Sequence, residues 1–212
     1  VTPDAVFPNN WVTTHPDGTI VLYPMCTPNR RAERQSDRLG ALLDQEGFQS
    51  TRVVDLTHFE GGGRFLEGTG SLVLERGSHV AFAIESPRTC QPVFDEFCMQ
   101  LGYEPVFFHA IDAKGVPVYH TNVIMSVGDD FCVLCTQSIS DETERAMVTA
   151  KIAELGLDLI DISFDQLGNF CGNCLQVRSA SGDPRIIMSQ TAYDNFTQEQ
   201  RDRLSQSGKL VP

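Results

Sequence analysis

The chain has 212 residues, 41% of them hydrophobic and 21% charged, which is typical of one globular domain and unlike a disordered chain. Its 28 acidic and 16 basic residues give a net charge of -12, which disfavours nucleic acid and anionic membrane surfaces as partners. No apolar run reaches the roughly 18 residues needed to cross a bilayer, and the first residues do not form a signal peptide. We therefore expect a cytoplasmic protein.

The spacing of apolar residues predicts strands and helices in a repeating order. The predicted elements of the first three units are a strand over 18–23, a helix over 31–45 and a strand over 51–56; strands over 70–74 and 79–84, a helix over 91–101 and a strand over 105–110; and strands over 122–127 and 131–135, a helix opened by Ser140 and a strand over 158–162.

A last unit begins with a hairpin of strands over 174–177 and 185–188. Thr197, with Gln200 three residues later, can cap a closing helix through Leu204. The order strand, strand, helix, strand recurs about every fifty residues, which predicts an internally repeated α/β fold.

Two short stretches have simple structural interpretations. The basic cluster over 29–34 carries its own carboxylate, so we interpret it as a helix start with a solvated charged face. The glycine run Gly61–Gly63 is typical of a turn, because a phosphate-binding loop would need a lysine and a following helix.

The seven cysteines are an odd number, and several lie in apolar stretches, which is typical of reduced thiols. The C-x-x-C spacings Cys132–Cys135 and Cys171–Cys174 raise a zinc site as one hypothesis. In a strand, however, residues three apart face opposite sides, and Cys171–Cys174 is followed by a strand pattern rather than the helix of a redox motif. We expect no metal and no cofactor.

Four stretches combine polar side chains with rigid neighbours in a way that a core does not require, namely 3–11, 66–70, 119–122 and 170–175. Together they supply a carboxylate, an imidazole and a thiol, the set needed for a nucleophile with a general acid and base. Taken singly, each residue also has an ordinary role in a turn or at a strand end.

In this order, the four stretches resemble the motifs of the guanidine-modifying (pentein) superfamily, which includes dimethylarginine dimethylaminohydrolases, arginine deiminases and amidinotransferases. The closest subgroup by resemblance is the amidinotransferase or arginine-deiminase-related family that includes citrulline hydrolases, through Val6–Trp11, Asn29–Arg34, Leu66–Gly70 and Tyr119–Asn122. The resemblance covers essentially the whole chain. It implies an α/β propeller, a pseudo-fivefold ring of ββαβ modules.

The resemblance also implies roles for individual residues. Asp4 matches the carboxylate that grips the guanidinium, Glu67 the acid that orients the substrate nitrogens, and His120 the general acid and base. Arg30 or Arg31, together with Arg88, fall where related hydrolases hold the substrate carboxylate.

Asn10 departs from the dimethylarginine hydrolases, which tend to have an aspartate there, and this favours a neutral ureido group such as that of citrulline. For the nucleophile, Cys174 precedes a Leu-x-Val strand as in the hydrolases, whereas Cys171-Gly172-Asn173 resembles the corresponding run of peptidylarginine deiminases. We favour Cys174 slightly and keep Cys171 as its rival.

The implied activity is cysteine-dependent hydrolysis at the guanidino or ureido carbon of arginine, citrulline or a related amino acid, with amidino transfer or a catalytically silent binding fragment as alternatives. Five modules of about fifty residues would need roughly 250 residues. With 212 residues beginning at Val1, we expect a single domain over 1–212 that lacks the N-terminal module and whose ring is open or closed by another chain. A homo-oligomer is compatible with the sequence.

Overall fold

A computed structural model of the protein describes residues 2 and 4–212. In these residues the strands form four three-stranded sheets, each with an antiparallel pair followed by a parallel pair. Each sheet and its helices are one ββαβ module, numbered 1 to 4 along the chain. The predicted α/β fold of repeated ββαβ modules is thus confirmed.

The strands of the modules are, in order, β1 (Val12–Thr14), β2 (Thr19–Leu22) and β3 (Arg52–Asp55); β4 (Leu72–Glu75), β5 (Val80–Ile84) and β6 (Glu104–Phe108); β7 (Met125–Val127), β8 (Phe131–Leu134) and β9 (Asp158–Asp161); and β10 (Leu175–Arg178), β11 (Pro184–Ile187) and β12 (Lys209–Val211). The middle strand of every sheet pairs with the other two strands. We call the first strand of each module its inner strand and the last its outer strand.

The principal helices follow the middle strands and are α1 (Pro28–Arg31) and α2 (Ser36–Gln45), α4 (Gln91–Leu101), α6 (Glu142–Glu154), and α8 (Gln190–Asn195) and α9 (Gln198–Ser207). Short helical turns are η1 (Pro8–Asn10), η2 (Thr57–Gly62), α3 (Gly68–Ser71), α5 (Thr121–Ile124), η3 (Thr136–Ser138) and α7 (Phe164–Gly168). None of the helices in the described part of the chain combines the length and apolar character that a membrane span requires.

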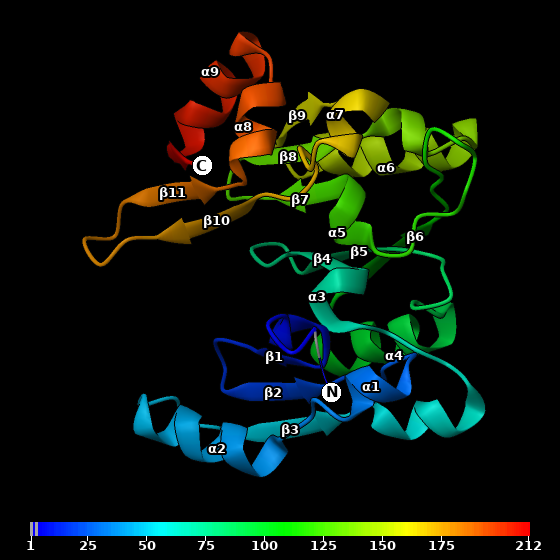
Figure 1. Cartoon of the computed structure of the whole chain (residues 1–212), viewed down its shortest axis with the longest axis vertical. Helices are drawn as coiled ribbons and strands as arrows, with labels where there is room; N and C mark the ends of the chain where they lie inside the picture. The colour runs from blue at the N-terminus through cyan, green and yellow to red at the C-terminus, as the bar shows by residue number, and fades with distance from the viewer. Residues whose placement is uncertain (1, 3) are drawn as a thin grey trace.

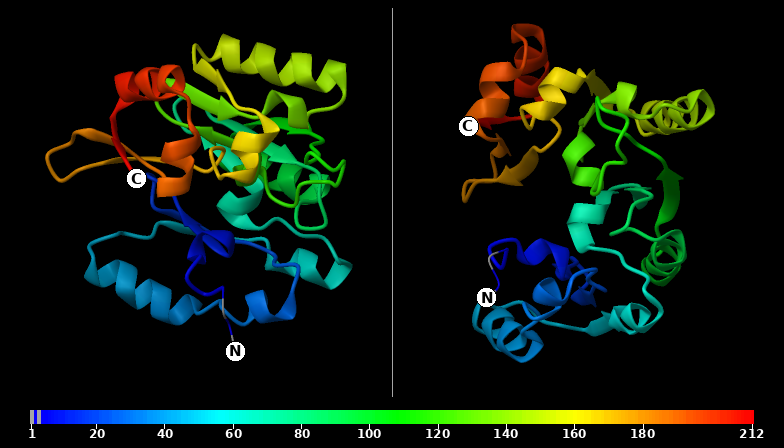
Figure 2. Two further views of the ribbon diagram at one scale, coloured as in Figure 1. Left: turned by 45° about the horizontal axis from the view of Figure 1, so that its top comes forward. Right: turned by 45° about the vertical axis from the view of Figure 1, so that its right-hand side comes forward.

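The modules follow one another along an open arc, with both chain ends on the same side (Figures 1 and 2). Each junction places the helix of one module against the outer strand of the module before it. Lys151 of α6 contacts Glu104 of β6 at 2.8 Å, and Arg203 of α9 donates to Asp158 of β9 at 3.0 Å. At the junction of modules 1 and 2, Arg52 of β3 donates to Gln100 Oε1 of α4 at 2.8 Å, so a polar contact between helix and outer strand recurs at each junction.

The same cross-strand row of side chains is buried at these junctions. The rows, read from inner to outer strand, are Thr13–Val21–Val54, Val73–Phe82–Val106 and Ser126–Val133–Ile160 in modules 1 to 3, and Leu175–Ile187–Val211 in module 4. The middle residue is 0% exposed in the first three modules, but Ile187 is 38% exposed and Leu175 63%. The row of module 4 therefore lies on the surface of this structure.

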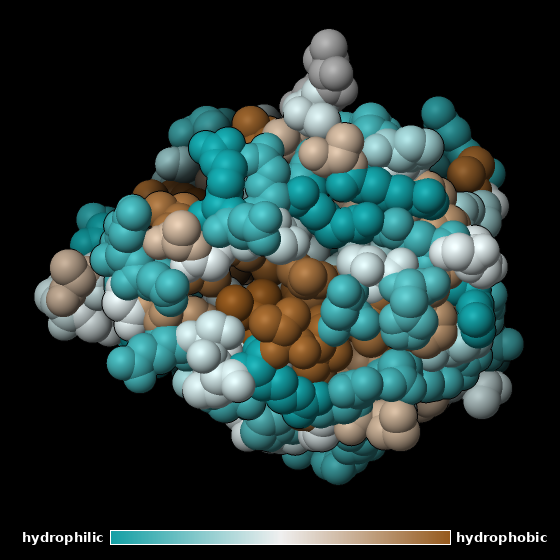
Figure 3. Space-filling model, turned by 90° about the horizontal axis from the view of Figure 1, so that it is seen from below, coloured by the Kyte–Doolittle hydropathy of each residue, from teal (hydrophilic) through white to brown (hydrophobic). Residues whose placement is uncertain are grey.

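The opposite end of the arc is also incompletely covered. An apolar hollow of about 200 Å³ lies between α2 and the sheet of module 1, lined by Ile20, Leu22, Leu39, Leu43 and Val53. Figure 3 shows apolar surface gathered in a hollow on the face that carries this module. Helix α2 has no buried residue, unlike α4 and α6.

The structure confirms several predicted elements together with their first and last residues or their caps. Helix α4 begins at Gln91 and ends at Leu101 as predicted, and its C-terminal residue is followed by Gly102 in the left-handed conformation that favours glycine. The Thr197 hydroxyl and the Gln200 side chain form the predicted capping box of α9.

The predicted single helix over 31–45 was wrong, because the chain turns between α1 and α2. The cluster over 29–34 is not a solvated face either. Arg30 is buried in an ion pair with Glu33 at 2.9 Å, and Arg34 binds Glu60 and the backbone carbonyl of Tyr23. These inward contacts fix the turn before α2.

Other boundaries also differ from the prediction. Helix α6 is capped by Asp141 rather than Ser140, since the Asp141 carboxylate accepts from two backbone N–H groups of the first turn. The strands predicted from residues 70 and 122 begin only at Leu72 and Met125, because α3 and α5 precede them. Strands β1 and β12 were not predicted, since three residues give too short a periodic signal.

Equivalent positions in two modules should respond differently to a buried charge. We expect Val133→Glu to lower the free energy of unfolding by at least about 3 kcal/mol, because its carboxylate would have no partner in the core. Ile187→Glu, at the matching position of module 4, should change it by less than about 1 kcal/mol. Urea unfolding followed by circular dichroism measures both, and equal losses would contradict the exposed row of module 4.

Candidate active site

The four polar stretches singled out in the sequence occupy the same place in their modules, immediately before the inner strand. These are η1 before β1, Glu67 with α3 before β4, His120 with α5 before β7, and Cys171–Cys174 before β10. Helical turn α3 packs against both η1 and α5. In Figure 1, α3 and α5 lie one above the other near the middle of the arc.

Glu67 and His120 form the centre of the candidate site. His120 Nε2 lies 2.8 Å from Glu67 Oε2. The Glu67 side chain is fully buried and the His120 side chain is 7% exposed. Because the turns before β4 and β7 lie in adjacent modules, residues 53 positions apart in sequence become a hydrogen-bonded acid and imidazole.

Glu67 is held by two further groups. Its Oε1 accepts the backbone N–H of Cys26 at 3.0 Å, and its Oε2 lies 3.3 Å from Nη1 of Arg88. Burial by itself raises the pKa of the Glu67 carboxyl, but the hydrogen bonds from His120 and Cys26 and the charges of His120 and Arg88 outweigh it. The net effect holds the pKa below its ordinary value, so Glu67 is ionised at neutral pH.

Gly70 separates His120 from Asn10. A Cβ atom built on Gly70 would lie 2.7 Å from Asn10 Oδ1 and 2.9 Å from His120 Nδ1, too close for any real contact. The backbone of α3 therefore forms the surface between the amide and the imidazole. Asn9 fastens this arrangement by donating to Thr69 Oγ1 at 3.0 Å and to Asn10 Oδ1 at 3.2 Å.

The cysteine-containing loop packs against the turn that follows His120. A Cβ on Gly172 would lie 2.3 Å from the carbonyl oxygen of Val123, and the Asn173 side chain donates to the carbonyl of Asn122 at 3.1 Å. Glycine is needed at 172 for this close approach. The loop is thus held within a few residues of the imidazole along α5.

The two thiols differ in environment. Cys171 is fully buried and its Sγ donates toward the carbonyl of Ala192 at 3.5 Å, whereas Cys174 is half-buried and its Sγ lies 3.5 Å from the carbonyl of Cys171. Burial raises the pKa of Cys171 to about 11. Burial, then the neighbouring Cys171, raise the pKa of Cys174 to about 12, against a hydrogen bond with Ser126 that lowers it. Both thiols are protonated at neutral pH in this state.

Three predicted binding residues are engaged with protein groups. Arg30 donates to the carbonyl of Phe7 at 3.1 Å, and Arg31 donates to the carbonyls of Met25 at 2.8 Å and Cys26 at 3.0 Å. Arg88 also stacks over the ring of Tyr119, 5.3 Å from its centroid.

Asp4 lies half-buried in the turn before η1, where its backbone carbonyl accepts the N–H of Phe7. Binding of substrate by Asp4, Asn10 or the arginines stays a prediction.

Sequence reasoning missed Cys26 and Tyr119 as parts of the site. The backbone N–H of Cys26 donates to Glu67, and the half-buried Cys26 thiol lies near the same carboxylate. Burial is the main cause that raises the pKa of this thiol, and the negative charge of Glu67 is the second. Tyr119 supports Arg88. The signals were weak, since Cys26 simply follows a predicted strand and Tyr119 simply precedes the histidine.

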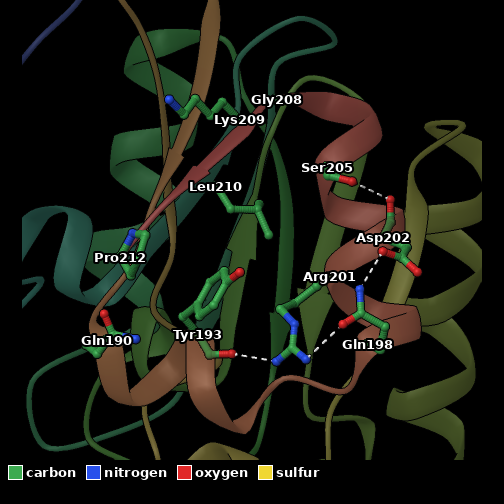
Figure 4. Close-up of a pocket in the computed structure, with 10 residues that line it drawn as sticks. All are labelled: Gln190, Tyr193, Gln198, Arg201, Asp202, Ser205, Gly208, Lys209, Leu210 and Pro212. Carbon is green, nitrogen blue, oxygen red and sulfur yellow. Dashed lines mark hydrogen bonds between the residues drawn. The ribbon is translucent and has the colours of Figure 1, made fainter.

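A cavity larger than the apolar hollow of module 1 lies away from these residues. It has a volume of about 550 Å³ and lies in module 4 between α8, α9 and β12 (Figure 4). Arg201 in its wall already donates to the carbonyl of Tyr193 at 2.9 Å and to Gln198 Oε1 at 3.2 Å. Within residues 2 and 4–212, no group of three or more His, Cys, Asp or Glu side chains is arranged to hold a metal ion.

Gly70→Ala should damage the site more than the fold. The added methyl group must displace Asn10 or His120, so we expect about 10²-fold lower activity toward the substrate proposed below, with a loss of about 1–3 kcal/mol in stability. Gly61→Ala is the matched control, because a Cβ there has no heavy atom within 4 Å. Equal activity of the two variants would show that the spacing of Asn10 and His120 at Gly70 does not matter for activity.

The ionised state of Glu67 predicts how stability depends on acid. Since its pKa is lowered on folding, its contribution is complete above the ordinary glutamate pKa of about 4.3 and is lost as the pH falls through the lower folded value. Glu67→Gln should therefore be less stable than the parent at neutral pH, and the difference should shrink toward about pH 3. Thermal unfolding at each pH measures this difference in stability. Glu142→Gln is the control, because the Glu142 side chain is 91% exposed. Parallel acid profiles for parent and Glu67→Gln would refute the assignment.

Comparison with solved structures identifies the same fold in larger proteins. The chain is 19% identical to ArgZ, an arginine dihydrolase from cyanobacteria, with a TM-score of 0.72. The matched region covers 99% of the present chain but only 30% of the ArgZ chain. Against the N-terminal domain of ArgZ bound to substrate it is 18% identical, with a TM-score of 0.73 and coverage of 99% and 69%. Against the dimethylarginine hydrolase DDAH from Pseudomonas aeruginosa, complexed with citrulline, it is 15% identical, with a TM-score of 0.63 and the same coverages.

A search of curated proteins found no match to this chain. The family described as N,N dimethylarginine dimethylhydrolase, eukaryotic, matches residues 1–212. Its match extends over all four modules and includes each of the four stretches that meet at the candidate site. The chain therefore belongs to the eukaryotic N,N dimethylarginine dimethylhydrolase family, within the pentein superfamily.

Proposed function

We propose that this protein is a cysteine-dependent hydrolase acting on the guanidino or ureido carbon of an arginine-like amino acid. The observation that carries the proposal is the buried, ionised Glu67 hydrogen-bonded to His120, beside a cysteine loop that packs on the turn following the histidine. A buried acid-imidazole pair of this kind can bind N–H groups and transfer protons at one carbon.

Two sets of comparisons support this class of reaction. The family is that of the dimethylarginine hydrolases. Among the structures of similar fold, the N-terminal domain of ArgZ has been solved covalently bound to a reaction intermediate, and AgrE has been solved with L-arginine. A covalent intermediate in a relative is consistent with a nucleophilic thiol here.

We propose Cys174 as the nucleophile because its thiol is half-buried, whereas that of Cys171 is fully buried and directed at the carbonyl of Ala192 in the core. Burial keeps the Cys174 thiol protonated in the unliganded protein. A cationic guanidinium bound beside it would favour the thiolate, since a nearby positive charge lowers a thiol pKa.

The proposed reaction then proceeds in two halves. The thiolate adds to the planar carbon, His120 donates a proton to the departing amine, and the C–N bond breaks to leave a thiouronium intermediate. Water next gives one proton to His120 and adds to the same carbon as hydroxide. The C–S bond then breaks to release the thiolate and, from a guanidino substrate, the ureido product, whose hydroxyl proton passes through solvent to the released amine. Glu67 holds substrate N–H groups and the imidazole in both halves.

Single substitutions test the assignment of the nucleophile. Cys174→Ser should reduce the release of amine from arginine or methylated arginine at least ~10³-fold, and His120→Gln about 10²–10⁴-fold. Cys90→Ser, which changes a half-buried thiol before α4 that the mechanism does not use, is the matched control and should retain activity. Ammonia or amine release, measured for each variant, gives the answer, and full activity of Cys174→Ser would transfer the role to Cys171.

Labelling separates this proposal from its alternatives. After incubation with a chloroacetamidine probe, we expect one adduct at Cys174, blocked by excess arginine or citrulline. An adduct with amidino transfer to an added amine, but no release to water, would identify an amidinotransferase. No selective adduct and no turnover would support a silent binding fragment instead.

A further inference from the structure

His109, directly after β6, lies between carboxylates from two modules. Its Nδ1 is 2.8 Å from Glu144 Oε1, in the first turn of α6, and its Nε2 is 2.8 Å from Glu85 Oε2, directly after β5. The backbone N–H of His109 also donates to Glu144 Oε2 at 2.8 Å. The side chain is 62% exposed, so solvent protons reach it freely.

The two contacts fix the charge state of this ring. An ionised carboxylate only accepts hydrogen bonds, so both ring nitrogens of His109 must donate, and the ring must be an imidazolium. The hydrogen bond to Glu144 is the largest influence and raises the pKa of His109; burial opposes it, and the hydrogen bond to Glu85 adds to the rise, so the pKa lies above its ordinary value. Glu85 and Glu144 are the charged groups that face the ring among the described residues. A neutral ring could keep only one of them.

The segment after Glu85 leads directly into the candidate active site. Ser86 Oγ donates to the carbonyl of Tyr119 at 2.8 Å and accepts the backbone N–H of Arg88 at 3.1 Å. Arg88 in turn contacts Glu67 and stacks on Tyr119. The turn over 85–89 therefore holds both ends of the loop over 109–119, which ends at the residue before His120.

We propose that His109 is a positioning residue whose imidazolium clamps the turn over 85–89 to α6 and thereby holds Arg88 and the Tyr119-His120 segment against Glu67. Loss of the ring proton releases one of the two carboxylates. The contacts of Arg88 and of the Tyr119-His120 segment with Glu67 then loosen. The effect on catalysis rests on the function proposed above, whereas the clamp itself does not.

The direction of the pH dependence follows from the raised pKa. The contribution of His109 to stability is complete below the ordinary histidine pKa of about 6.5 and is lost as the pH rises through the higher folded value. The clamp is therefore closed in mildly acidic solution and open in alkaline solution.

The experiment compares the parent chain with His109→Gln and with Glu85→Gln from about pH 5.5 to about pH 9. Thermal unfolding and hydrogen exchange at residues 85–89 and 119–120 report on the clamp. The parent should be more stable and better protected than His109→Gln at the acidic end, and the two should converge at the alkaline end. His58→Gln, an exposed histidine bonded only to a backbone carbonyl, is the matched control and should follow the parent.

Steady-state kinetics with arginine supply the second readout. His109→Gln should raise KM and lower kcat, with kcat/KM reduced about five-fold or more at the acidic end, and the difference should vanish at the alkaline end. If the parent has no turnover, the proposed function fails, but unfolding and exchange still decide on the clamp. Superimposable unfolding and exchange profiles of the parent and His109→Gln over the whole pH range would overturn it.

Discussion

The buried carboxylate of Glu67 is the constraint on which the candidate site depends. An unpaired charge at that depth would be strongly destabilising, so the surrounding structure must supply donors. It does so from three separate parts of the chain, through His120, the N–H of Cys26 and the guanidinium of Arg88. Each donor belongs to a different turn, and one charge thus fixes the relative positions of modules 1, 2 and 3.

The repeated module explains why those turns meet. In each ββαβ unit the chain enters the inner strand from the same side, and helix-to-strand contacts such as Lys151 with Glu104 repeat the same step between units. Residues far apart in sequence, such as Glu67 and His120, therefore become neighbours through identical local geometry. The buried cross-strand rows add apolar packing to each step.

Much of this arrangement could be predicted from the sequence. Strands such as β8 and helices such as α4 have strong periodic patterns, and the capping box at Thr197 is a local signal. The break before α2 depends on Arg34 reaching Glu60, a contact between residues 26 apart that no local pattern contains. The environments of Cys171 and Cys174 likewise depend on packing against α8 and β7, which explains why sequence alone could not separate the two thiols.

The common position of the four polar stretches bears on how such proteins diverge. Each module presents a few residues to the shared centre from the turn before its inner strand, and modules 1 and 2 add Cys26 and Arg88 from the segments after their middle strands. Acid, imidazole and thiol can thus be exchanged separately, one module at a time, on an unchanged frame. Such an arrangement tolerates wide sequence drift, in keeping with identities of 15% to 19% to solved structures of the same architecture.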